Sequence, residues 1–291
     1  SDSENREYPG ELTTEEGIEL LDDLADFGVP VVLFSGGEPL LRPDIFELIE
    51  HARSRGLRTT LSTNGTLITP EVAARLKLLG MGYVGISLDG IGKVNDMFRG
   101  HKGAFEKAVR GFENCKAVGQ RVGLRMTLTR HNVEHLDQIF SFIEEAGIER
   151  ACFYHLVYSG RGNRKDELSN EETRAAVERI LWWSRHFAER GLNKEILTVD
   201  NHADGVFVYR KLLEEGETER AAEVLSVLKW NGGGLYSSGV GIANVDFLGN
   251  VHPDQFWWSA VLGNVRERRF SEIWQDLSNP LLAGLRNRAP L

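Results

Sequence analysis

The chain has 291 residues, of which 41% are hydrophobic, and a formal net charge of −9 at pH 7. This length suffices for one large domain or for one domain with a small appendage. The acidic balance argues against general nucleic-acid binding, although a local basic pocket could still hold an anionic ligand. The sequence shows neither an apolar run near the roughly 20 residues of a membrane span nor a signal-peptide pattern. We therefore expect a cytoplasmic protein that binds no nucleic acid and no membrane.

The first two-thirds of the chain alternates strand and helix patterns. Apolar runs predict six strands, at residues 29–34, 58–62, 83–88, 121–129, 150–157 and 195–199. Periodicity, capping residues and stop signals predict the helices, at residues 13–28, 43–56, 70–80, 103–118, 133–146 and 169–190. Repeated units of this length are typical of a parallel sheet covered by helices. Because such connections are right-handed, we expect an α/β fold whose sheet closes, at least partly, into a barrel.

The pattern changes after about residue 200. Further helices are predicted at residues 203–214, 217–228 and 271–277. A short hairpin is predicted around Phe247-Leu248-Gly249. We therefore expect one domain over residues 1–200 and a small C-terminal subdomain over residues 201–291.

Polar and glycine-rich residues gather where the predicted strands end. They are Gly36-Gly37-Glu38-Pro39, Ser62-Thr63-Asn64, Ser87-Leu88-Asp89 and Ser159-Gly160-Arg161. In barrel enzymes, the face formed by the carboxyl ends of the strands holds the chemistry. Two adjacent glycines let the backbone approach a bound molecule closely, and Glu38 offers an acceptor for an ammonium group. The alternative is a set of tight, solvated turns, because Asn-Gly alone is common in turns.

Cysteine is scarce in this sequence. Cys115 lies in a helical pattern and Cys152 in an apolar strand, and both fit the role of small buried hydrophobic residues. Two isolated cysteines cannot hold an iron–sulfur cluster, which usually needs three or four thiolates at close spacing.

Ser-Gly-Gly-Glu-Pro-Leu at residues 35–40, after an apolar strand, resembles the motif with which radical S-adenosylmethionine (SAM) enzymes hold the amino group of SAM. The resemblance spans nearly the whole chain. It implies a partial (β/α)6 TIM-like barrel of radical SAM type with a small C-terminal SPASM-like subdomain. The cofactor-binding residues that it implies are Gly36, Gly37, Glu38, Pro39, Ser62, Thr63, Asn64, Ser87, Asp89 and Arg99. For Arg99 a surface salt bridge is the alternative, and the sequence indicates no catalytic acid or base.

Later motifs narrow the family. The segments at residues 153–162 and 249–257 resemble the radical SAM enzymes of heme d1 biosynthesis and of the siroheme-dependent heme pathway. They are more similar to the group that removes acetate side chains from 12,18-didecarboxysiroheme, giving iron-coproporphyrin via a 5′-deoxyadenosyl radical. The resemblance implies an iron tetrapyrrole substrate. The substrate-binding candidates are His155, Tyr158, Arg161, His202 and His252.

The chemistry of these side chains suits a flat, anionic iron complex. Arginine pairs with carboxylates in fork geometry, and neutral imidazole is a good ligand for iron. For each single histidine, however, a plain structural role is the alternative.

The resemblance further implies a radical SAM [4Fe–4S] cluster, one auxiliary cluster, and an electron donor such as ferredoxin or flavodoxin. The family holds its first cluster on a Cys-x3-Cys-x2-Cys loop, and this loop is absent from the sequence. By the same comparison both cysteine-bearing ends look cut off, the first barrel strand included. We therefore expect the intact parent protein to carry out the catalysis.

Three alternatives remain open. The first is an enzyme that removes propionates from the same substrate on the route to heme d1. The second is a radical SAM peptide maturase, which shares the style of C-terminal appendage. The third is a cluster-free scaffold that binds a tetrapyrrole or SAM. A conventional barrel aldolase fits least, because no lysine lies at a predicted strand end.

Overall fold

The structure is a computed structural model, and it describes residues 9–160, 162–234 and 237–287. The described chain forms two compact units. The first spans Gly28–Asp200, and the second combines helix α1 (Thr14–Asp26) with the residues from Asn201 onward. The units meet in sequence where the pattern changes, but residues 9–27 belong to the second unit and not, as expected, to the first.

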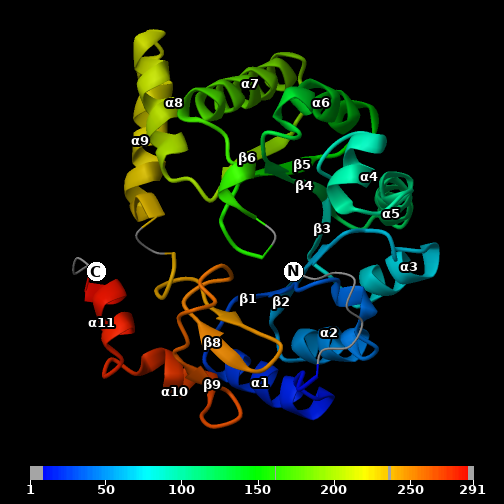
Figure 1. The fold of residues 1–291 in the computed structure, drawn as a ribbon, viewed down its shortest axis with the longest axis vertical. Helices are drawn as coiled ribbons and strands as arrows, with labels where there is room; N and C mark the ends of the chain where they lie inside the picture. The colour runs from blue at the N-terminus through cyan, green and yellow to red at the C-terminus, as the bar shows by residue number, and fades with distance from the viewer. Residues whose placement is uncertain (1–8, 161, 235–236, 288–291) are drawn as a thin grey trace. The chain divides into compact units, whose positions relative to one another are not determined.

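A six-stranded parallel sheet with its strands in chain order forms the first unit (Figure 1). The strands are β1 (Val31–Phe34), β2 (Arg58–Thr63), β3 (Tyr83–Ser87), β4 (Val122–Leu128), β5 (Arg150–His155) and β6 (Glu195–Val199). All six predicted strands are confirmed, with ends that differ by at most about two residues. Within the described residues β1 and β6 do not pair with each other, so the barrel is partial.

Helices cover the outside of this curved sheet (Figure 1). They are α2 (Ile45–Ser54), α3 (Pro70–Leu78), α4 (Lys93–Arg99), α5 (Ala104–Ala117), α6 (Leu136–Glu145) and α7 (Asn170–Glu189). Short 3-10 turns are η1 (Pro39–Leu41), η2 (Val133–His135) and η3 (Arg164–Asp166). Helix α4 has no counterpart among the predicted elements. It starts after Gly92, where φ is +56° and no side chain caps the helix, so the sequence carries no start signal.

The apolar core lies between the outer face of the sheet and the helices. Successive strand residues point to opposite faces, and outward residues such as Leu61, Leu124 and Phe153 are fully buried. Phe140 of α6 lies at the centre of an aromatic stack, with its ring centroid 5.0 Å from that of Phe153 and 5.3 Å from that of Trp183. The inner face of the sheet is left with mostly polar, half-buried residues.

Contacts between residues distant in sequence join α1 to the rest of the second unit. Arg266 binds Glu16 with Nε 2.6 Å from Oε1 and Nη2 2.8 Å from Oε2. The hydrogen bond from Arg266 lowers the pKa of Glu16 to about 2. Asp23 accepts hydrogen bonds from the amide and hydroxyl of Ser271 at 2.9 and 2.6 Å. These contacts explain why α1 groups with the C-terminal residues.

The other elements of the second unit are short. They are α8 (Ala203–Glu214), α9 (Thr218–Trp230), η4 (Gly232–Gly234), β7 (Asn244–Val245), β8 (Asn250–His252), β9 (Gly263–Asn264), α10 (Phe270–Gln275) and α11 (Pro280–Asn287). The predicted hairpin is present as β7 and β8, and β9 adds an unpredicted third strand. The SPASM-like character of this unit stays a prediction. Among the described residues no helix has both the length and the apolar composition that a membrane span requires.

Replacing Phe140 with alanine tests the location of the core. We expect the free energy of unfolding to fall by about 3–5 kcal/mol, because the substitution removes a buried ring and leaves a cavity. Leu78 is 85% exposed, and the control Leu78→Ala should change stability by less than about 0.5 kcal/mol. Urea denaturation followed by tryptophan fluorescence measures both. Equal effects of the two substitutions would contradict this account of the core.

Candidate active site

Glu38 joins the carboxyl ends of β1 and β2. Its carboxylate, only 7% exposed, accepts hydrogen bonds from Thr63 Oγ1 at 2.7 Å, Asn64 N at 2.7 Å and Leu40 N at 3.2 Å. Because a carboxylate offers about four acceptor positions, capacity for one further donor remains. Burial raises the pKa of Glu38, against the lowering effect of these hydrogen bonds and of the positive charge of Arg99.

The glycines before Glu38 leave the backbone open to approach. Gly36 has φ of +141°, a conformation that side chains other than glycine rarely adopt, and a Cβ there would meet no atom within 4 Å. Gly36 is exposed and Gly37 is half-buried. Pro39 is buried and begins the turn η1, which Glu38 caps. A ligand can therefore reach the backbone of the glycine pair directly.

Asp89 joins β3 and β4 in the same way. It is 1% exposed, and its Oδ1 accepts a hydrogen bond from Thr127 N at 2.9 Å, while Oδ2 forms an ion pair with Arg99. The charge of Arg99 also acts on Glu38. Arg99 therefore pairs with Asp89, and only its charge reaches Glu38, so the surface salt bridge considered for Arg99 is instead a largely buried pair.

Two buried asparagines complete this network, and the sequence analysis does not single them out. Asn95 Oδ1 accepts a hydrogen bond from Asp89 N at 2.9 Å. Asn132 Nδ2 donates to the carbonyls of Asp89 at 3.1 Å and Thr127 at 2.8 Å. Their signals are weak, since Asn95 lies on the unpredicted helix α4 and Asn132 resembles any polar residue in a turn.

Three of the predicted cofactor-binding side chains keep unused polar groups. Strand register places Ser62 and Ser87 on the inner face, and within the described residues their hydroxyls make no hydrogen bond. Asn64 Oδ1 accepts from the amide and hydroxyl of Thr66 at 2.8 and 2.7 Å. Its Nδ2 has no partner in the described part of the chain. A ligand could bind these groups without breaking an existing hydrogen bond.

Comparisons with known proteins identify the family. Residues 1–143 match the Radical SAM superfamily. The chain is 55% identical over 287 residues to the Fe-coproporphyrin III synthase of Methanosarcina barkeri, which covers 98% of this chain and 71% of that protein. The chain belongs to the radical SAM superfamily.

A second relative and a solved structure are also similar to this chain. The chain is 41% identical over 285 residues to the pre-heme d1 synthase of Dinoroseobacter shibae, covering 97% of this chain and 70% of that protein. The solved structure of native anSMEcpe with bound AdoMet superposes with a TM-score of 0.70 at 19% identity, covering 93% of this chain and 74% of that chain. At this identity the likeness shows the shared fold alone.

Radical SAM enzymes use SAM and a [4Fe–4S] cluster, and the residues present suit the first of these groups. The open glycine backbone, the spare acceptor capacity of Glu38 and the unused groups of Ser62, Asn64 and Ser87 match the amine, carboxylate and hydroxyls of SAM.

The cluster does not fit the residues of this chain. Cys115 belongs to the apolar core and Cys152 lies on the inner face of β5, and both are buried. The described residues contain no group of three side chains able to hold a metal ion. The three thiolates that a radical SAM cluster needs are therefore not among these residues.

The predicted substrate residues do not form one group. His155 ends β5 and is half-buried, and Tyr158 is exposed three residues later. His202 precedes α8 in the second unit, where its ring packs against Gly234. Arg161 lies outside the described residues.

His252 does not suit the role of an iron ligand. Its ring is 1% exposed, with Nδ1 2.8 Å from the Ala260 carbonyl and Nε2 3.1 Å from Asp246 Oδ2. Because each ring nitrogen already contacts an oxygen atom of the protein, neither is free to bind a metal. Hydrogen bonds from Asn250 and His252 outweigh burial and lower the pKa of Asp246. We therefore assign His252 to the structure of the β7–β8 turn and withdraw it as a substrate ligand.

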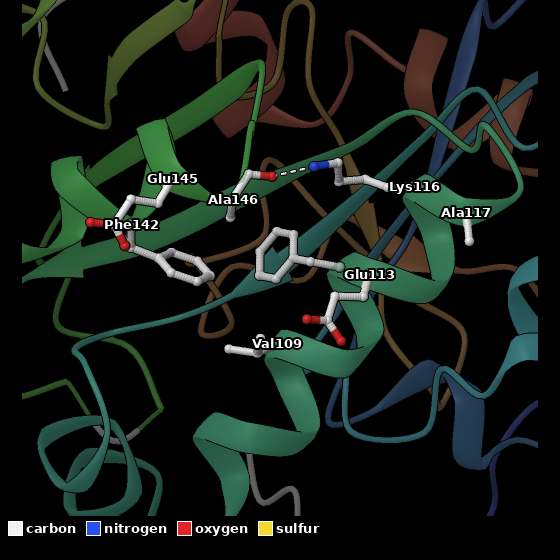
Figure 2. Close-up of a pocket in the computed structure, with 8 residues that line it drawn as sticks. Val109, Glu113, Lys116, Ala117, Phe142, Glu145 and Ala146 are labelled. Atoms are coloured by element: carbon white, nitrogen blue, oxygen red, sulfur yellow. Dashed lines mark hydrogen bonds between the residues drawn. The ribbon is translucent and has the colours of Figure 1, made fainter.

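A surface groove between α5 and α6 is separate from this site. Figure 2 shows its lining, in which Val109 and Glu113 of α5 face Phe142 of α6 and Lys116 donates a hydrogen bond to the Ala146 carbonyl. Helices of βα units run antiparallel to the strands, so the C-terminal halves of α5 and α6 lie at the amino end of the sheet. The groove is therefore at the opposite end from Glu38 and Asp89.

Replacing Glu38 with glutamine tests whether this carboxylate holds the two strand ends together. We expect a loss of about 1–3 kcal/mol in the free energy of unfolding, because the glutamine amide donates where Glu38 accepts. A raised pKa means that the folded state holds the proton more tightly than the unfolded state. The stability that wild-type Glu38 contributes therefore declines as the pH rises above 4.5. The difference in the free energy of unfolding between wild type and Glu38→Gln should shrink over the same range.

The control for this test is Glu50→Gln on the exposed side of α2, which should leave stability unchanged at every pH. Urea denaturation between about pH 5 and about pH 8 measures both variants. A deficit that grows with pH, or none at all, would rule out the role assigned to Glu38.

Proposed function

We propose that this chain is the SAM- and substrate-binding framework of an enzyme that removes acetate side chains from 12,18-didecarboxysiroheme to give iron-coproporphyrin. The 55% identity to Fe-coproporphyrin III synthase over 98% of the chain carries the proposal. Removal of propionates from the same substrate is the second candidate, because the chain is also 41% identical to a pre-heme d1 synthase. A peptide maturase and a cluster-free scaffold are less favoured, since both of these relatives are named for tetrapyrrole synthesis.

We infer that SAM binds at the carboxyl ends of β1, β2 and β3. Its amine would meet the backbone of Gly36 and Gly37 and the remaining acceptor position of Glu38. Its other polar groups would meet the hydroxyls of Ser62 and Ser87 and the amide of Asn64. Thr63, Asp89 and Arg99 would support the site without binding SAM themselves, because they hold Glu38 and the strand ends in place. When bound, SAM would supply the precursor of the radical, while this chain would orient the reactants.

The iron tetrapyrrole would lie over the same edge of the sheet. His155, at the carboxyl end of β5, is the remaining histidine of the first unit that was predicted to bind the iron, and Tyr158 is exposed nearby to cover the macrocycle. Arg161 would pair with a substrate carboxylate, and His202 stays a prediction within the second unit. The reaction also needs one electron from a donor such as ferredoxin or flavodoxin.

SAM binding by a Ser87→Ala variant tests the cofactor site. We expect affinity for SAM to fall about three- to tenfold, because one hydrogen bond is lost. The midpoint of thermal unfolding should not change, since the Ser87 hydroxyl has no partner in the described chain. Isothermal titration calorimetry measures the affinity, with Ser54→Ala on α2 as the control. Equal SAM affinity in wild type and Ser87→Ala would remove Ser87 from the site.

Titration with iron-coproporphyrin III tests the proposed function. Binding should shift the Soret band, and His155→Ala should change the spectrum of the bound iron, because it removes the proposed axial ligand. His51→Ala, on α2, is the control and should leave the spectrum unchanged. Failure of the wild-type protein to bind this porphyrin would refute the proposal. In a form of the protein that also carries the cluster cysteines, the mass of the product formed from 12,18-didecarboxysiroheme would separate loss of acetates from loss of propionates.

A further inference from the structure

The inner face of the first unit carries polar side chains that the proposed function does not yet use. This inner-face cluster consists of Tyr83, Arg125, Arg150, Cys152, Tyr154 and Glu195. Arg125 lies at its centre, since strand register places it beside Ser87 of β3 on one side and Cys152 of β5 on the other. The cluster is therefore continuous with the face on which we infer that SAM binds.

Arg125 has no anionic partner. Its guanidinium lies 4.5 Å from the ring centroid of Tyr154, and across the described residues it makes neither a hydrogen bond nor an ion pair. The nearest acidic member of the cluster is already engaged. Glu195 binds Arg150 Nη1 at 2.9 Å and Arg121 Nη2 at 3.1 Å. Two arginines therefore share the only carboxylate of the cluster, and Arg125 is left with an aromatic contact alone.

The backbone makes room for this arrangement. A Cβ on Gly85 would lie 2.5 Å from Arg125 Cδ, and a Cβ on Gly123 would collide with the Tyr83 hydroxyl. Gly85 and Gly123 are paired in the strand register, so the inner face has no side chains there. This leaves room for the aliphatic part of Arg125 and the ring of Tyr83. The Tyr83 hydroxyl is itself buried without a partner in the described chain. Burial raises the pKa of Tyr83 to about 12, so this hydroxyl stays a neutral donor.

The Arg125 guanidinium is open to a ligand. The side chain is half-buried, and none of its nitrogen atoms is fully buried, so a bound anion could reach its N–H groups. Tyr154 lies against the guanidinium, and within the described chain no residue accepts a hydrogen bond from its N–H groups. Those groups match the two oxygens of a carboxylate in fork geometry. Both ligands of the proposed function carry carboxylates, and the one other arginine of the cluster, Arg150, is already paired with Glu195.

We propose that Arg125 binds a carboxylate of a ligand that lies on the inner face beside Ser87. The inference rests on the proposed function and deepens it, because it assigns the residue that recognises the anionic part of the ligand. The carboxylate belongs either to a side chain of the iron tetrapyrrole or to SAM. The two sources share one chemistry, and separate titrations distinguish them.

The experiment compares Arg125→Gln and Arg125→Lys with wild type in the full chain. Arg121→Gln is the matched control, since Arg121 directly precedes β4 and its side chain is exposed. Its partner Glu195 remains paired with Arg150 when Arg121 is replaced. Each protein is titrated with iron-coproporphyrin III, with its tetramethyl ester, and with SAM. Soret absorbance follows the porphyrins and calorimetry follows SAM.

If the substrate supplies the carboxylate, Arg125→Gln weakens iron-coproporphyrin III binding by about tenfold or more and leaves the ester unaffected. Arg125→Lys loses less, because the charge remains without the fork. If SAM supplies it, the same loss appears in the SAM titration. Unchanged affinity for both ligands overturns the inference. If wild type binds no porphyrin, the proposed function fails, and the SAM titration alone then decides the role of Arg125.

Stability separates this role from a structural one. Arg125→Met keeps the length of the side chain and removes a charge that pairs with no residue of the described chain, so the midpoint of thermal unfolding should stay nearly the same. If Arg125 had a structural role, the midpoint would fall by several degrees, because a loss of about 1 kcal/mol lowers it by about 2–4 °C in a protein of this size. Such a fall would contradict the assignment.

Discussion

The site depends on two buried carboxylates at the ends of neighbouring parallel strands. Glu38 ties β1 to β2 through Thr63 and Asn64, and Asp89 ties β3 to β4 through Thr127. Buried carboxylates are stable only when donors surround them, and here the donors come from the next strand along the chain. The position of each strand end is therefore coupled to that of its neighbour. Arg99 pairs with Asp89 and its charge also acts on Glu38, so the two strand pairs are coupled electrostatically.

The two faces of the sheet divide the work between folding and function. Outward residues such as Leu61 and Phe153 are fully buried against the helices and provide the stability of the unit. Inward residues such as Ser62, Ser87 and Arg125 contribute little to that core and keep polar groups unused. Because the core does not rely on them, this face can hold unpaired donors at modest cost. The superfamily assignment and the unused donors point to the same edge of the sheet.

Sequence patterns predict the sheet well because most strands contain an apolar run and are bounded by glycine or polar turns. They predict Glu38 as a site residue for the same reason, since it directly follows such a strand. They cannot show which residues that are distant in sequence contact each other in the fold. The amphipathic pattern of α1 indicates a packed helix, but only the contacts of Glu16 and Asp23 with distant residues assign it to the second unit. The sequence indicates His252 as a substrate ligand and does not indicate Arg125, because only the structure shows which polar groups have partners.

Hydrogen–deuterium exchange with and without SAM tests the central claim, that the carboxyl ends of β1, β2 and β3 form the cofactor site. The account predicts slower amide exchange on SAM binding at residues 36–40, 62–66 and 87–99, which share the Glu38–Asp89–Arg99 network. The groove between α5 and α6 should exchange at the same rate in both states. Protection confined to that groove or to the second unit, with no change at these strand ends, would contradict the account.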